Sequence, residues 1–117
     1  MIINDNSKVI ESISGISGLE LQGIKLFLQG AVYCWVKNRK NEVFALRDLV
    51  GGENTDWSET PLEALYQKHI LLKKDVESAN KVAGQEAGQV LKLVLKNDSR
   101  KFELSDAGLS NGYVWVE

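Results

Sequence analysis

The segment from Leu19 to Lys37 constrains the fold most, because its apolar residues recur with the period of a helix. At 100° per residue, nine residues fall on one broad arc: Leu21, Ile24, Phe27, Leu28, Ala31, Val32, Cys34, Trp35 and Val36. This arc is wider than a surface helix needs in order to cover one core. We therefore expect a helix over residues 19–37 with more apolar surface than a single core contact requires.

Two residues of this segment, Leu26 and Tyr33, lie outside the arc and are seven positions apart. Gly23 and Gly30 repeat the same spacing beside them, so another backbone can come close to that flank. Each glycine costs roughly 1 kcal/mol in helix propensity. Two interpretations are open: tight packing within the chain, or a homodimer interface that contains Leu26 and Tyr33.

The length of 117 residues, with 44% hydrophobic residues and a formal net charge of −2, indicates one small domain with one core. Residues 1–17 lack helical periodicity, so we expect a flexible leader or arm there and a single domain over residues 18–117. No apolar segment approaches the ~20 residues that span a bilayer. Without a signal-peptide pattern and with a single cysteine, the chain is expected to be cytoplasmic and not to contact a membrane.

The remaining pattern predicts a mainly helical α+β fold, with a short strand after the first helix and a C-terminal β-hairpin. The short strand is expected at residues 42–46, and the hairpin pairs residues 101–104 with 113–116. One small core is expected to bury five residues from different parts of the chain: Trp35, Phe44, Val90, Leu91 and Phe102.

The middle of the chain predicts further helices. Residues 60–63 form a capping box, which predicts a helix over 61–70. Asp75 can cap the next helix, for which two alternatives remain. The helix either breaks near Gly84 or continues unbroken to Asn97.

The order of helix, short strand, two helices, strand, turn-rich loop and strand resembles the winged helix-turn-helix fold over about residues 19–116. Within it, residues 79–92 are similar to a helix-turn-helix, with Gly84 in the turn and Val90 as the buried anchor of the second helix. Asn80 stands where that pattern favours alanine. The chain also looks like small uncharacterised bacterial proteins of the kind carried on mobile gene cassettes, a likeness that implies no activity. The winged-helix resemblance implies a small DNA-binding regulator.

Independently of this resemblance, one outward helix face is typical of nucleic-acid binding. Gln85, Gln89, Lys92 and Lys96 stand at spacings of four, three and four, with no acid between them on that face. Glutamine can read an adenine edge, and lysine can contact guanine or phosphate. Arg100 and Lys101 begin the next strand, where phosphate contacts are expected. We therefore expect these six residues to contact double-stranded DNA.

The same row of Gln and Lys is also the pattern of an ordinary solvated helix face. The whole chain is acidic, yet its charge is uneven, with a net charge of +3 over residues 73–101 and −5 over residues 42–63. The competing hypothesis is a protein-interaction module. It would bind a partner through the acidic loop 48–63 or through the aromatic strand 113–116.

No enzyme fingerprint is visible in the sequence. One histidine and one cysteine are too few for a metal site. We expect His69 to be a surface or capping residue, and Cys34 to be a small core residue. The pair of glycines at 51–52 lacks the Lys-Ser/Thr of a phosphate-binding loop. A non-enzymatic protein without metal or cofactor is therefore expected.

Overall fold

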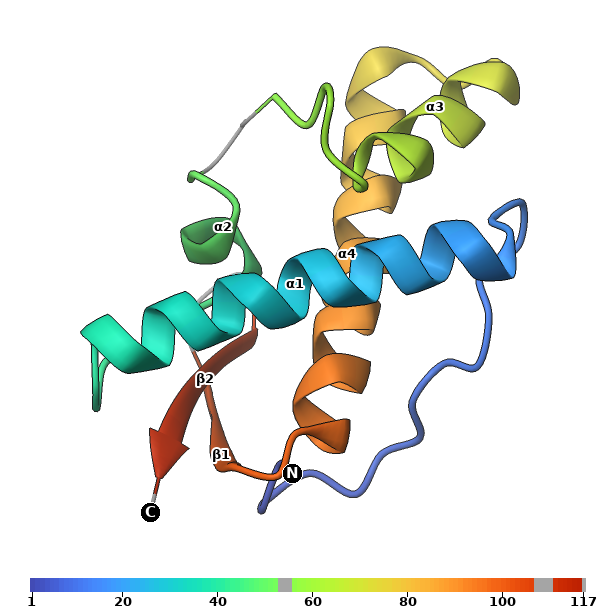
Figure 1. Ribbon diagram of the computed structural model, residues 1–117. Helices are drawn as coiled ribbons and strands as arrows, with labels where there is room; N and C mark the ends of the chain where they lie inside the picture. The colour runs from blue at the N-terminus through green and yellow to red at the C-terminus, as the bar shows by residue number, and fades with distance from the viewer. Residues whose placement is uncertain (53–55, 107–110, 117) are drawn as a thin grey trace.

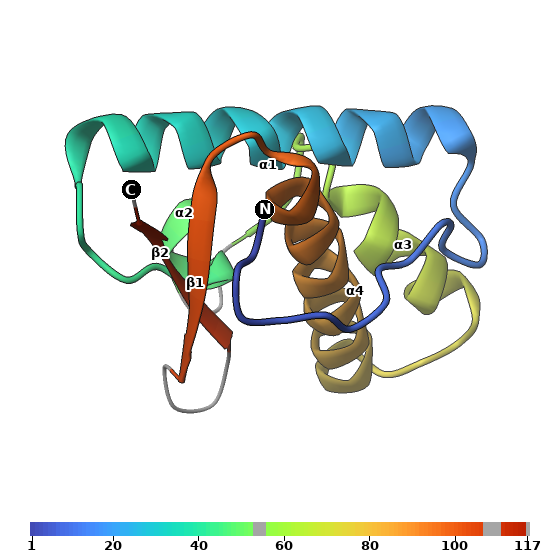
Figure 2. The same ribbon diagram turned by 90° about the horizontal axis from the view of Figure 1, so that it is seen from below.

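The computed structural model describes residues 1–52, 56–106 and 111–116 (Figure 1). Within them the chain forms α1 (Gly18–Asn38), α2 (Leu46–Leu49), α3 (Glu63–Leu71), α4 (Val76–Asn97), β1 (Lys101–Asp106) and β2 (Asn111–Val116). α1 crosses α4, while the hairpin and α3 lie on opposite sides of α4 (Figure 2). This is the predicted mainly helical α+β class with a C-terminal hairpin. No helix of the described residues is long and apolar enough to cross a membrane.

α1 confirms the helix predicted from the apolar arc. Its start is fixed by a capping box in which Ser17 Oγ accepts from the Glu20 amide at 3.0 Å and Glu20 Oε1 accepts from the Ser17 amide at 2.9 Å. Its buried residues are spaced by four: Ile24, Leu28, Val32 and Val36. This narrow buried row lies against the core, so part of the predicted wide arc remains at the surface.

The strand predicted at residues 42–46 is not formed, and that prediction is wrong. Phe44 alone makes an antiparallel bridge, with two backbone hydrogen bonds of 2.8 Å to Tyr113 of β2. α2 begins only two residues later, and its Asp48 carboxylate accepts from the Ala45 amide at 2.8 Å. Because the chain turns into a helix at once, one residue is all that can pair with the sheet edge.

α3 begins at Glu63, two residues later than the capping box predicts. The Glu63 carboxylate accepts from the Glu59 amide at 3.0 Å, and Thr60 Oγ1 accepts from the Leu62 amide at 3.2 Å. These bonds close turns before the helix, so the reciprocal bonding of the predicted box does not occur.

α4 is one continuous helix, as one of the two alternatives predicted. Asp75 caps its start by accepting from the Ser78 amide at 2.7 Å, and the helix passes through Gly84 to Asn97. A single glycine does not break a helix whose flanking turns are packed. Residues 79–92 therefore contain no turn between two helices. Among the helices of the described residues, α3 and α4 are joined by the shortest link, the turn at residues 72–75.

The core lies between α1, α4 and the hairpin. Phe44, Val90, Leu91 and Phe102 are all buried, as predicted. Trp35 is half-buried at the edge, with its ring centroid 5.8 Å from that of Phe44, which in turn lies 6.1 Å from Phe102 in an edge-to-face arrangement. These aromatic contacts attach α1 and the segment at residue 44 to the hairpin.

Residues 1–17 form an irregular segment, here called the arm, that runs beside α4 from the hairpin to the start of α1 (Figure 2). Its beginning adds to the sheet, because Ile2 pairs in parallel with Phe102 of β1. Ile2 and Ile13 are buried in the core. The arm is therefore packed against the domain near both of its ends.

Candidate nucleic-acid interface

The outward face of α4 borders a groove of about 540 Å³ between this helix, α2 and β2. Gln85, Gln89 and Lys92 line it from α4, and Asn111 from β2. Lys81, one turn before Gln85, adds a second ammonium group. None of the described residues that line the groove is acidic. Three of the six predicted contact residues are thus brought together at one concave surface.

Two glycines of α4, Gly84 and Gly88, also line this groove. A Cβ atom built on either would meet no heavy atom within 4 Å. Neither packing within the chain nor a positive φ requires glycine there. The helix backbone is therefore open to close approach at this face, at a propensity cost of roughly 1 kcal/mol per glycine.

Lys92 and Lys96 are both held by the arm. The Lys92 ammonium donates to Ser7 Oγ and lies 3.4 Å from Asp5 Oδ2. The Lys96 ammonium donates to the Ser7 carbonyl. Carboxylate, hydroxyl and carbonyl oxygens of the arm thus meet two lysines in the way that phosphate oxygens would.

Asp5 is a permanent anion in this contact. Its Oδ1 accepts from the Ser7 hydroxyl at 2.6 Å and from the Ser7 amide at 2.9 Å. These bonds, joined by the charge of Lys92, lower the pKa of the Asp5 carboxyl to about 2. Lys92 therefore faces a full negative charge at neutral pH.

Arg100 lies apart from the groove, at the link between α4 and β1. Its guanidinium makes two hydrogen bonds, of 3.0 and 2.8 Å, to the buried carboxylate of Asp98, and its Cζ lies 4.4 Å from the ring centroid of Tyr33. Gln29 of α1 donates to the same carboxylate at 3.0 Å. Burial acts to raise the pKa of Asp98, but the hydrogen bonds from Arg100 and Gln29 outweigh it and lower that pKa. Arg100 thus joins α1 to the hairpin.

Lys101 is exposed on the outer face of the hairpin, next to Glu103. Residues alternate between the faces of a strand, and the intervening Phe102 points into the core. The structure therefore distributes the six predicted residues over three places: the groove, the arm contact beside it, and the base of the hairpin.

The proposed dimer residues Leu26 and Tyr33 are exposed on α1, with 63% and 55% of their surface accessible. Leu19, seven residues before Leu26, is 84% exposed. Within the described chain, Gly30 has open space where its Cβ would lie, and Gly23 approaches only Pro61. Among the described residues, Arg100 covers one side of the Tyr33 ring, and the rest of this face is exposed.

His69 belongs to a buried cluster that the sequence analysis missed, and its predicted surface position is wrong. Its Nε2–H donates to Glu86 Oε1 at 2.7 Å, and its Nδ1 accepts from Lys74 at 2.8 Å. Lys68 donates to the other oxygen of Glu86 at 2.5 Å. Glu86 stands at helical spacing after Ala79 and Ala83, which are both buried. This spacing indicates that Glu86 lies on the helix face toward α3.

Cys34 is exposed, so its predicted core position is also wrong. It lies two residues from buried Val32 and from buried Val36, and two residues in a helix turn the side chain by about 200°. Among the described residues, no group of three or more His, Cys, Asp and Glu side chains could hold a metal ion.

Comparisons of the chain with protein-family models, with curated proteins and with solved structures find no match. The geometry of the α4 face is therefore the basis for assigning a function.

Proposed function

We propose that this chain is a small, non-enzymatic DNA-binding protein that contacts the duplex with the outward face of α4. One observation carries the proposal. Lys81, Gln85, Gln89 and Lys92 line one groove, and none of the described residues that line it is acidic. The helix backbone beside them is left open at Gly84 and Gly88. Amide groups that can read a base edge and ammonium groups that can bind phosphate are the two kinds of contact that a major-groove helix needs.

In this proposal the helix-turn-helix lies elsewhere in the chain than the sequence resemblance implies. The turn at residues 72–75 joins α3 to α4, so the helix-turn-helix would consist of these two helices rather than of residues 79–92. α4 would then be the recognition helix and the β1–β2 hairpin the wing. The tip of that wing, residues 107–110, lies outside the described residues.

The alternative, a protein-interaction module, stays a prediction. In the aromatic strand, Tyr113 is buried, and the Trp115 ring is covered by Lys40, whose Nζ lies 5.0 Å from its centroid. These rings are engaged within the chain. In the acidic loop 48–63, residues 53–55 lie outside the described part of the chain. The exposed residues Leu19, Leu26 and Tyr33 of α1 instead favour a second copy of this chain as a protein partner.

The proposal is tested by fluorescence anisotropy of mixed-sequence duplex DNA at several salt concentrations. Binding should weaken steeply with salt, because each lysine on a phosphate releases about one counterion. Lys81→Ala should reduce the magnitude of the log K against log salt slope by about 0.9. Gln89→Ala should alter sequence preference with little change in that slope.

Lys37→Ala is the matched control, since it removes an exposed lysine at the far end of α1. Its slope should equal that of the wild type. Absence of binding at ~50 mM salt and about 10⁻⁴ M protein, the weak end of non-specific affinity, would overturn the DNA proposal. A protein partner would then be the leading hypothesis.

A further inference from the structure

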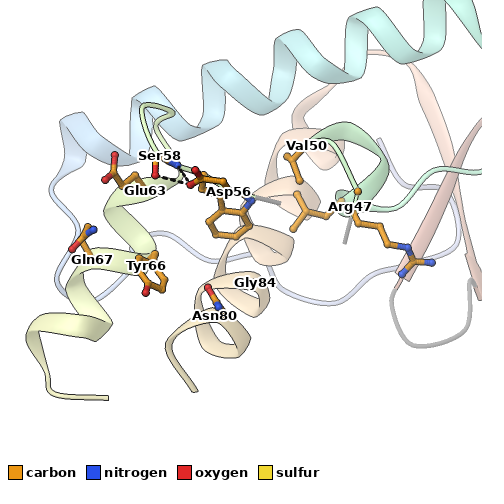
Figure 3. A pocket seen from close by; sticks show the side chains of 12 residues that line it. Arg47, Val50, Asp56, Ser58, Glu63, Tyr66, Gln67, Asn80 and Gly84 are labelled. Carbon is orange, nitrogen blue, oxygen red and sulfur yellow. Dashed lines mark hydrogen bonds between the residues drawn. The ribbon is translucent and has the colours of Figure 1, made fainter. Parts of the chain in front are cut away.

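A second concavity, here called the α2–α3 pocket, lies on the other side of Leu46 and Gly84 from the groove. It has a volume of about 560 Å³ and is bounded by α2, residues 56–58, α3 and the first half of α4 (Figure 3). Small-molecule sites typically measure about 300–1,000 Å³. The pocket is therefore large enough for a ligand of several rings or a short chain.

Two aromatic residues, Trp57 and Tyr66, line this pocket. Both are half-buried and pack against the core, so their positions are fixed by the fold. Among the described residues, neither the Tyr66 hydroxyl nor the side-chain amides of Gln67 and Asn80 have a hydrogen-bond partner in the chain. The pocket thus combines aromatic surface with neutral polar groups that are available to a ligand.

Two carboxylates, Asp56 and Glu63, stand on the same side of the pocket (Figure 3). Asp56 Oδ1 accepts from the Ser58 hydroxyl at 2.5 Å and from its amide at 2.8 Å, and these bonds lower the pKa of Asp56. Glu63 uses one oxygen for the Glu59 amide at 3.0 Å. One oxygen of each carboxylate therefore remains available, and Asp56 is ionised at neutral pH.

The cation of the pocket does not neutralise this side. Arg47 lies at the opposite end, and its guanidinium is directed away from Asp56 and Glu63 (Figure 3). Among the described residues that line the pocket, no cation therefore stands beside the two carboxylates. An anionic ligand would meet repulsion there, whereas a positively charged group would meet two acceptors and an aromatic face.

We propose that the α2–α3 pocket binds a small organic cation, an amine carried on an apolar body. The ammonium group hydrogen-bonds to Asp56 and Glu63, and the apolar body packs on Trp57 and Tyr66. Among the described residues, no group of three or more His, Cys, Asp and Glu side chains gathers here that could hold a metal ion in place of such a ligand. This proposal stands independently of DNA binding, because no nucleic acid takes part in it.

The test is a titration of the ¹⁵N-labelled full chain with 2-phenylethylamine at pH 7, followed by ¹H–¹⁵N spectra. We expect saturable shifts of the Trp57 indole N–H and of the Tyr66 and Gln67 amides, with a millimolar dissociation constant. The neutral analogue 2-phenylethanol and the anion 3-phenylpropionate should shift these signals far less. Equal effects of the three compounds, or no shift at about 10 mM amine, would overturn the proposal.

Variants locate the charge contact. Asp56→Asn and Glu63→Gln should each weaken amine binding about fivefold, because each removes one charge and keeps the shape of the side chain. Glu103→Gln, on the outer face of the hairpin, is the matched control and should bind like the wild type. Unchanged affinity in both pocket variants would place the amine elsewhere and overturn the proposal.

A final titration separates two sources of the cation. Nα-acetyl-lysine methylamide presents the same ammonium group as a peptide side chain. Weaker binding of this compound than of 2-phenylethylamine supports a free amine as the ligand. Tighter binding would overturn the small-molecule assignment and identify a lysine-containing peptide.

Discussion

Glu86 joins α3 to α4 by charge, because it accepts from both Lys68 and His69. The side chains of Lys68, His69 and Glu86 are at most 16% exposed, so solvent screens their interaction little. Lys68 also donates to the Ser14 carbonyl at 2.6 Å, which extends the cluster to the arm. One carboxylate thus holds three parts of the chain.

Glu86→Gln is expected to lower the free energy of unfolding by about 1–3 kcal/mol, because it leaves a poorly solvated lysine without its anion. Urea denaturation at pH 7 measures this loss. Glu42→Gln is the control: it breaks the exposed pair with Arg39, whose N–O distance is 3.6 Å, and should cost less than about 1 kcal/mol. Equal losses in the two variants would show that the buried cluster does not stabilise the fold.

The burial of individual side chains is the feature that the sequence predicts least well. His69 and Cys34 were misplaced for opposite reasons. His69 is buried against α4, where its partner Glu86 lies 17 residues further along the chain, and no local pattern predicts such a partner. Cys34 lies among apolar residues, but α4 and the hairpin cover a narrower strip of α1 than the apolar arc allows. Burial of single residues depends on tertiary contacts that periodicity does not contain.

At the scale of elements, long periodic segments were predictable and short ones were not. α1, α4 and the hairpin each show their period over many residues, and their bounds lie close to the predicted ones. The residues before and within α2 are too few to show a full helical or strand period. The sequence therefore predicts a strand at residues 42–46, whereas the structure has a single β-bridge followed by a four-residue helix. The groove residues on α4 were found because one helix carries them. The α2–α3 pocket was missed because several segments build it.

The arm is the element whose role the sequence least revealed, since its contacts with α4 join residues more than 80 positions apart. If α4 binds DNA, Asp5 and Ser7 compete with phosphate for Lys92 and Lys96. Asp5→Asn combined with Ser7→Ala should therefore raise DNA affinity about fivefold, because it removes the ion pair of Asp5 with Lys92, whose side chains are only 16% and 20% exposed. The salt slope should grow by up to about two as both lysines become available.

Glu11→Gln is the matched control for this double variant, because it removes one negative charge from an exposed position of the same arm. Its affinity should stay near that of the wild type, while a purely global charge effect would raise it as much as the double variant. The anisotropy titration used for α4 measures both. Unchanged or lower affinity in the double variant would exclude Lys92 and Lys96 from the DNA contact.

In the molecule as a whole, a single chain of 13.0 kDa leaves an apolar row exposed on α1. Leu19, Leu26 and Tyr33 are more than half exposed and repeat every seven residues, the spacing by which helices pack side by side. Gly30 lies between the last two with open space above its backbone. A second copy of α1 would cover this row, and a symmetric pair would make the contact twice.

We therefore expect a homodimer of twice 13.0 kDa in sedimentation equilibrium at micromolar concentration. Leu26→Glu should shift the mass to the monomer, because dimerisation would bury two unpaired carboxylates near the symmetry axis. The variant should fold normally, since Leu26 is exposed in the single chain. Leu71→Glu is the control: it places the same charge at an 80% exposed leucine at the end of α3 and should leave the dimer intact. A monomeric wild type would contradict the dimer, and a dimeric Leu26→Glu variant would place the interface on another face.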